Sequence, residues 1–341
     1  MKYIAPLLGL LLCYFNANAQ NVIVVQHNGT SSFFTTFSSA ISGASSGDTI
    51  YLPGGQMSTG NISIDKEVHI IGAGYRVDSS QATSRTDLDG NIYLITGADS
   101  SSFEGFYLSG GIGLGYLNTN LRLVNDLSFV RVNVGGIDLT SYYFQWLWNG
   151  QSSNCLISEC VVRNYLRGYG YRGLRVEKTI FTNCNLDPLQ SCTETLFLNN
   201  VFLLGSNPSI GNNDSSCVFK NNVFIGQSPI YESVYFSNSY EYSLSNTAIS
   251  LPLQTNSYEN VSNIFVNQVC GNSFESQDFH LQNPSSYPGT DGTQVGIYGT
   301  GLPFKDGAFP SNPHIAYKSI APGTDSDGNL QINMIVTSQD H

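Results

Sequence analysis

Arginine and tyrosine residues gather between positions 163 and 175 of an otherwise acidic chain. The sequence holds 14 Lys and Arg residues against 25 Asp and Glu, for a net charge of −11. Guanidinium groups pair with carboxylates and sulfates, and tyrosine rings stack on cations. This pattern suggests a groove for an acidic polysaccharide, formed by Arg163, Tyr165, Arg167, Tyr169, Tyr171, Arg172 and Arg175. Alternatively, these side chains pair with Glu159, Glu177 and Asp187 on neighbouring segments and simply cover the surface.

Several carboxylates near this stretch offer a second kind of chemistry. Neighbouring strands of a sheet lie about 4.8 Å apart, so two acids could flank a glycosidic bond, or acids with Arg131 could serve a lyase. The candidates are Asp126, Asp138, Glu159, Glu177 and Glu194. Surface acids are more often solvated than catalytic. The sequence therefore favours binding over catalysis, and we assign no catalytic residue.

The segment from Asp325 to Asn329 carries oxygen ligands at alternate positions, as calcium loops do. It lacks the later Glu of an EF-hand, and its Asp-Gly pair is also typical of a turn before a strand. The five histidines are scattered, and the cysteines form no Cys-x-x-Cys pair. We expect no metal site and no cofactor, with calcium at this loop as the one open alternative.

A repeat of about twenty residues must position these groups. Asn199-Asn200-Val201-Phe202 recurs as Asn221-Asn222-Val223-Phe224, and the frame extends back through Ile180-Phe181 to Val161-Val162. Short β-type runs at this period indicate a parallel β-solenoid, whose coils bury their apolar faces only against one another. Asn200 and Asn222 are then expected to stack as an amide ladder, and Phe202 and Phe224 to stack in the core.

The N-terminal region predicts a short helix followed by strands. Phe37, Ala40, Ile41 and Ala44 have helical spacing, and such a helix could cover the open end of the first coil. With Leu52-Pro53-Gly54-Gly55 and Ile70-Ile71-Gly72-Ala73-Gly74, this region resembles the start of right-handed parallel β-helix proteins of the pectin-lyase-like superfold. That resemblance implies the fold. The Gly-His-Gly element and Asp-Asp pair of its polygalacturonase-like members are missing here.

From Gly289 the periodicity fades into turns and prolines. The segments 289–299, Pro303-Phe304 and Asn312-Pro313-His314-Ile315 resemble the C-terminal part of uncharacterised secreted β-helix proteins from Bacteroidetes-type bacteria. We expect an extended tail that covers the unpaired edge of the last coil, and a final strand from Leu330 to Val336.

The chain begins as a secretory signal peptide would. Lys2, an apolar run from Ile4 to Phe15 and Ala17-Asn18-Ala19 predict cleavage after Ala19 and a protein that is secreted, periplasmic or bound to the cell surface. Export permits disulfides, but a solenoid core can equally hold stacked thiols. The cysteines concerned are Cys155, Cys160, Cys184, Cys192, Cys217 and Cys270.

Together these observations predict an all-β chain: a signal peptide at 1–19, a right-handed parallel β-helix with a short N-terminal capping helix at 20–288, and an extended C-terminal tail with a final strand at 289–341. We expect a monomer that binds polysaccharide without catalysis or has a structural role. The alternative is a polysaccharide lyase or glycoside hydrolase that acts on an acidic glycan. The acidic balance argues against nucleic acid as a partner, and no segment after the signal peptide is long enough to span a membrane.

Overall fold

The repeats seen in the sequence pair with one another in parallel. Val161 of β10 (Val161–Arg167) lies opposite Ile180 of β12 (Ile180–Phe181), which lies opposite Val201 of β15 (Val201–Leu203). Val201 in turn lies opposite Val223 of β17 (Val223–Ile225). The predicted alignment of the coils, at 19 to 22 residues a step, is confirmed by these registers.

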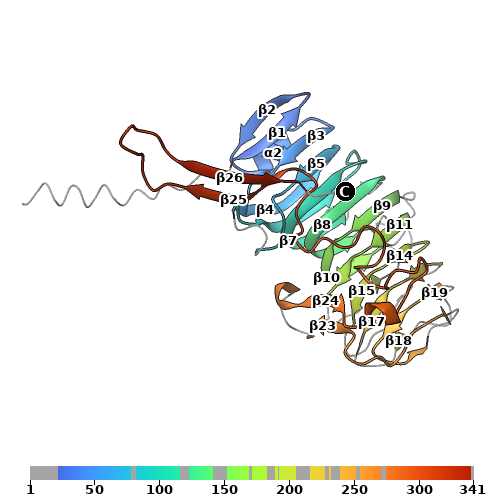
Figure 1. The fold of residues 1–341 in the computed structure, drawn as a ribbon. Coiled ribbons are helices and arrows are strands. Elements are labelled where there is room, and N and C mark those ends of the chain that lie inside the picture. Colours follow the sequence, from blue (N-terminus) through green and yellow to red (C-terminus); the bar gives the residue numbers. More distant parts are fainter. Residues whose placement is uncertain are drawn as a thin grey trace, which may run out of the picture.

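The chain is all-β and is dominated by one long, mostly parallel sheet, an arrangement compatible with a β-solenoid (Figure 1). The computed structural model describes residues 22–77, 82–115, 123–140, 152–168, 171–182, 189–190, 192–204, 216–226, 230–231, 239–250, 254–269 and 274–338.

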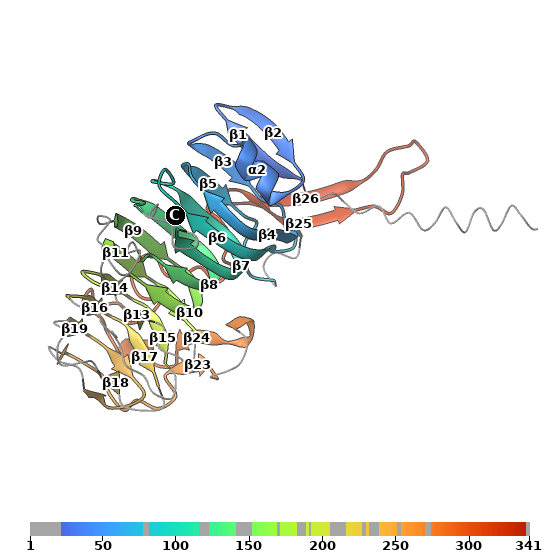
Figure 2. The ribbon, with the colours of Figure 1, turned by 180° about the vertical axis from the view of Figure 1, so that it is seen from behind.

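Within this sheet the strands follow one another in two columns (Figure 2). The first column contains β3 (Asp48–Tyr51), β5 (Val68–Ile71), the starts of β7 (Ser102–Leu114) and β8 (Leu127–Asp138), β9 (Ser152–Ser158), β11 (Tyr171–Glu177), β14 (Leu196–Leu198), β16 (Val218–Lys220), β19 (Ser239–Glu241) and β22 (Gln254–Thr255). The second contains β4 (Gly55–Ile64), β6 (Thr86–Leu94), the ends of β7 and β8, then β10, β12, β15, β17 and β20 (Leu244–Ser245). The end of β10 pairs separately with β13 (Leu189–Gln190).

Smaller elements lie at the two ends. At the N-terminal end β1 (Ile23–His27) pairs antiparallel with β2 (Thr30–Phe34) and with β3. A short helix lies where the sequence predicts one: α2 (Phe37–Gly43) begins at Thr36, whose side chain accepts a hydrogen bond from the Ser39 amide, and buries Phe37, Ala40 and Ile41. The remaining elements are β18 (Ile230–Tyr231), β21 (Ile249–Ser250), β23 (Phe265–Asn267), η1 (Phe274–Ser276), β24 (Asp278–Leu281), η2 (Pro284–Ser286), β25 (His314–Ile320) and β26 (Ile332–Thr337).

Identical side chains stack from coil to coil inside the sheet, as predicted. The centroid of the Phe202 ring lies 4.8 Å from that of Phe181 and 5.0 Å from that of Phe224, and the three rings are nearly parallel. Asn200 and Asn222 form the expected ladder, with the Asn200 amide donating to Asn222 Oδ1 at 3.0 Å. Because both asparagines are fully buried and also bond backbone groups, the ladder satisfies polar groups that the dry interior would otherwise leave unpaired.

Residues 289–313, here called the strap, run back along one corner of the stack from its C-terminal coils towards its N-terminal coils (Figure 1). This path differs from the expected cover over the last coil. The reason is that corner side chains of successive coils offer donors and acceptors to the strap backbone. In chain order these contacts join Gly296 to Asn199, Leu302 to Lys178, Lys305 to Glu159, Phe309 to Arg131, and Ser311 to Glu104.

Candidate functional site

The outward face of β7, β8 and β10 carries a tyrosine laid over glycine. Tyr165 lies in register with Gly136 of β8, which is in register with Gly111 of β7. A Cβ atom added to Gly136 would come within 2.6 Å of the Tyr165 ring, and one added to Gly111 would lie 3.7 Å from its hydroxyl. The ring can lie flat only because Gly136 lacks a side chain. Gly113, the next outward residue on β7, also lacks a side chain, so β7 offers only backbone beside the ring there.

Arg167 completes this face. Its guanidinium carbon lies 4.3 Å from the Tyr165 ring centroid, a cation–π distance. Its Nη1 lies 3.6 Å from the carboxylate of Asp138, the residue opposite it in register. Partial burial, and next the charge of Asp138, raise the pKa of Tyr165, so the phenol stays protonated. We call Tyr165, Arg167, Asp138, Gly111 and Gly136 the tyrosine–arginine site.

Arg163 lies on the same strand but is turned into the structure. Its Nη2 donates to the carbonyls of Leu108 and Ser109 at 2.6 and 2.9 Å, and its guanidinium stacks on Tyr107 at 4.2 Å. Burial lowers the pKa of Arg163. Arg85 stacks on the same Tyr107 ring at 4.2 Å. The role of Arg163 is therefore to hold neighbouring coils together.

The other sequence-predicted site residues lie elsewhere. Tyr171 is buried, donates to the Ser153 carbonyl at 3.1 Å, and has a pKa raised by that burial. Arg172 and Arg175 are on β11, in the first column, and pair with Glu194 at 3.6 Å and Glu177 at 2.7 Å. Tyr169 and Asp187 lie outside the described residues. The structure thus brings together Arg163, Tyr165 and Arg167 and separates them from Arg172 and Arg175.

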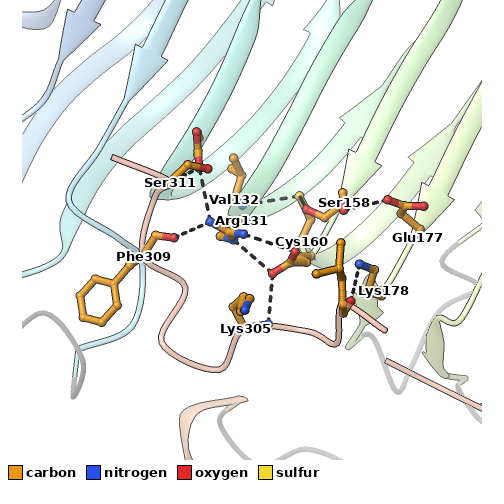
Figure 3. A network of polar contacts seen from close by, with 12 residues as sticks. Arg131, Val132, Ser158, Cys160, Glu177, Lys178, Lys305, Phe309 and Ser311 are labelled. Atoms are coloured by element: carbon orange, nitrogen blue, oxygen red, sulfur yellow. Dashed lines mark hydrogen bonds and ion pairs between the residues drawn. The ribbon is translucent and has the colours of Figure 1, made fainter. Parts of the chain in front are cut away.

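Arg131 and Glu159 belong to a buried network that binds the strap (Figure 3). The Arg131 Nε donates to Glu159 at 3.1 Å, and its Nη1 donates to the Phe309 carbonyl at 2.9 Å and lies 3.5 Å from Glu104. Only 8% of the Arg131 side chain and 9% of Glu159 are exposed. The carboxylates of Glu159 and Glu104 also accept the strap amides of Lys305 and Ser311. This pair is occupied in holding the strap.

One backbone feature explains why the strap contacts recur from coil to coil. A left-handed backbone recurs at this corner, with φ between 48° and 56° for Arg131, Glu159, Lys178, Asn199 and Asn221, while Glu104 precedes a left-handed glycine, Gly105. Non-glycine residues adopt this conformation at a cost, so its repetition marks a position that the surroundings fix. The conformation directs each of these side chains to the strap. The sequence did not reveal this row of corner residues, because the backbone angle φ has no direct signature in residue type.

The remaining candidate carboxylates bind an asparagine or arginine side chain rather than a second carboxylate. Asp126 accepts from the Asn154 amide at 2.9 Å, while Glu177 and Glu194 pair with arginines of β11. Within the described ranges, no group of three His, Cys, Asp or Glu residues has the arrangement of a metal site. The geometry does not join the five carboxylates into one centre.

The segment proposed as a calcium loop forms the turn between β25 and β26. The Asp325 carboxylate accepts the backbone amides of Asp327 and Asn329 at 3.0 and 2.8 Å. The hydrogen bond from the Asn329 amide is the main reason that the pKa of Asp325 is lowered. The alternating oxygens are therefore explained by the turn itself.

The four cysteines among the described residues, Cys155, Cys160, Cys192 and Cys217, are buried. Cys155 and Cys160 are buried thiols outside any disulfide, and burial raises the pKa of Cys160 to about 12. This favours buried thiols over disulfides for Cys155 and Cys160. Cys217 donates its thiol proton to the Cys192 carbonyl at 3.4 Å. Cys184 and Cys270 lie outside the described residues.

In the part of the chain that the structure describes, no helix is both long and apolar enough to cross a bilayer. Comparison of the chain with protein-family models, with curated proteins and with solved structures finds no match in any of the three. The function must therefore be inferred from the tyrosine–arginine site.

Proposed function

We propose that this protein is a secreted or cell-surface right-handed parallel β-helix that binds an acidic polysaccharide and does not cleave it. The signal-peptide pattern supports export, and the parallel registers support the β-helix. The position of α2 beside the first strands supports its role as a cap, and the path of the strap supports an extended tail.

The observation that carries the binding proposal is Arg167 stacked on Tyr165 in the tyrosine–arginine site. Two-fifths of the Arg167 side chain is exposed, and the ring beneath fixes the guanidinium in one orientation. A guanidinium held in this way can bind a carboxylate or sulfate through bidentate hydrogen bonds with little loss of side-chain entropy. Gly113, the next outward residue on β7, carries no side chain, so a sugar ring could lie beside the tyrosine there. Because neighbouring coils repeat, a polymer can continue along the same face.

The lyase or hydrolase alternative is supported less well. It needs carboxylates that converge on a bond, whereas Glu159 holds the strap and Asp138 pairs with Arg167. A structural role without a ligand is the second alternative, in which Arg167 serves only to hold Tyr165 and Asp138 in place.

The test compares binding of the mature chain to polygalacturonate, alginate and chondroitin sulfate, with dextran as the neutral control, by affinity electrophoresis and calorimetry. Arg167→Ala is expected to weaken binding to the preferred acidic polymer at least tenfold, about the effect of losing one charge-assisted contact. Arg172→Ala is the matched control, since Arg172 is half-exposed and pairs with Glu194 on the other column.

Equal affinity of both variants and the wild type, or no binding to any acidic polymer, would refute the proposal. Unsaturated products or new reducing ends, lost on changing Asp126, Asp138 or Glu159, would instead establish the enzymatic alternative. N-terminal sequencing of the exported chain tests the expected start at Gln20.

A further inference from the structure

Beyond the strap, the chain leaves the stack as an isolated hairpin. β25 and β26 pair antiparallel, with Ile320 opposite Ile332 and Lys318 opposite Met334, and within the described residues they pair with no other strand. Both views show this hairpin projecting from the N-terminal end of the stack (Figures 1 and 2). We call residues 314–337 the arm.

The arm exposes apolar side chains that a solitary hairpin cannot bury. Ile332, Met334 and Val336 alternate along β26, so they share one face with Ile320 of β25, and the exposed fractions of these four side chains are 50%, 56%, 59% and 53%. Lys318, opposite Met334, lies on the same face. A two-stranded hairpin is at best marginally stable in water, and its open edges invite pairing. A third layer or strand is needed to complete this element.

At the base of the arm is an apolar cleft of about 640 Å³ between the arm and the first coils. The stack contributes Leu52, Pro53 and Ile71, and the arm side contributes Pro313 and Ile315. Lys318 also lines the cleft. Because Ile315 lines the cleft and lies opposite Val336, the apolar side chains of the arm continue from the cleft wall.

Charge indicates what covers this surface. The chain as a whole carries a net charge of −11, so two copies repel over most of their surfaces. The two strands of the arm contain no acid and one lysine, Lys318, while the turn at the tip contains Asp325 and Asp327. Two arms laid antiparallel would bring the acidic tip of each towards the lysine of the other. This face is therefore suited to a second copy of the same chain.

We propose that the arm is a dimerisation element: the apolar faces of two arms stack antiparallel about a twofold axis, and each tip reaches the cleft of the other copy. This pairing is isologous, since the same patch serves both copies. The apolar side chains, the polar residues between them and the cleft would bury roughly 600 Å² on each copy, about 1,200 Å² in total, at the lower end for stable interfaces. The proposal departs from the monomer expected from sequence and is independent of polysaccharide binding.

The test measures the molar mass of the mature chain by light scattering and sedimentation from about 1 to 100 µM. The wild type is expected to have twice the mass of the chain at the upper concentrations. Met334→Asp should be monomeric, because it places a carboxylate among the apolar side chains that the dimer would bury. Asn333→Asp, the neighbouring exposed residue on the opposite face, should remain dimeric.

A charge exchange gives a second readout. Lys318→Glu should weaken the dimer at least tenfold, and Lys318→Glu combined with Asp327→Lys should restore much of the affinity. Thermal unfolding of every variant should match the wild type, since these side chains are exposed. A monomeric wild type at 100 µM, or a dimer insensitive to Met334→Asp, overturns the proposal. So does binding of the wild type to phosphatidylcholine–phosphatidylglycerol vesicles that Met334→Asp abolishes while the mass stays monomeric, because a lipid surface would then be the partner.

Discussion

Replacing Arg131 with methionine should destabilise both the strap and the coils beneath it. The guanidinium lies among the carboxylates of Glu159 and Glu104 and the carbonyl of Phe309, with 8% of its side chain exposed. Methionine keeps much of the volume but removes the charge. Two poorly solvated carboxylates are then left facing each other, and the Phe309 carbonyl loses its donor.

The size of the effect follows from burial. Removing one partner of a buried ion pair costs about 3–5 kcal/mol, because the remaining charge stays in a poorly solvated place. We expect a loss of about 3–5 kcal/mol in the free energy of unfolding. Residues 302–311 should open before the coils unfold, since the buried network holds this part of the strap, while the apolar side chains of Val295 and Ile297 hold its earlier part.

Two measurements check this expectation. Urea denaturation gives the free energy of unfolding, and amide hydrogen exchange gives the local opening of residues 302–311. Arg131→Met with Glu159→Met should cost less than Arg131→Met alone, because the most closely paired carboxylate is removed with its partner. Arg172→Met is the matched control: its ion pair with Glu194 is half-exposed, and such pairs contribute about 0–1 kcal/mol.

The reasoning is refuted if Arg131→Met costs no more than Arg172→Met, or if exchange in the strap stays at its wild-type rate. Either result would mean that the strap is held by something other than the buried network. A double variant as unstable as the sum of its single variants would show that Arg131 and Glu159 act independently.

Two further predictions concern the core. Asn200→Ala removes the acceptor of the Thr179 amide and a donor to the Val176 carbonyl, both buried. At ~1–3 kcal/mol for each unsatisfied group, the free energy of unfolding measured by urea denaturation should fall by about 3 kcal/mol. The exposed Asn61→Ala should cost no more than about 0.5 kcal/mol, and a similar cost for both variants would disprove the ladder's role. Cys160 should resist thiol reagents in the native state, because its folded pKa of about 12 leaves little thiolate. Since an unfolded thiol loses its proton near pH 8.5, stability should fall as the pH rises from about 8.5 towards 12, and Cys160→Ala should reduce that slope; rapid native labelling would contradict this.

The architecture could be read from the sequence because it repeats. Val201-Phe202 and Val223-Phe224 lie in register, and Asn200 and Asn222 form the ladder. Each coil buries its interior only against the next, so identical residues at the same phase must stack. The short helix at Phe37 was also predictable, because a threonine cap and apolar spacing are local signals.

The candidate site was only partly predictable. The cluster from Arg163 to Arg175 is continuous in sequence, but the chain turns between β10 and β11, so Arg167 and Arg172 lie on different columns. Gly136, which lets Tyr165 lie flat, and its neighbour Gly111 were overlooked. Their signal is the recurrence of Gly110-Gly111 as Gly135-Gly136, one coil later.

Sequence alone determined which residues stack, because stacking within a solenoid is a matter of period and residue type. Only the tertiary structure decided which side chains remain open to a ligand. The strap reaches Arg131 across 178 positions of sequence, and no local pattern encodes a contact at that separation. The exposure of the arm was equally hidden, because a strand that alternates apolar residues looks the same in sequence whether its partner is present or absent.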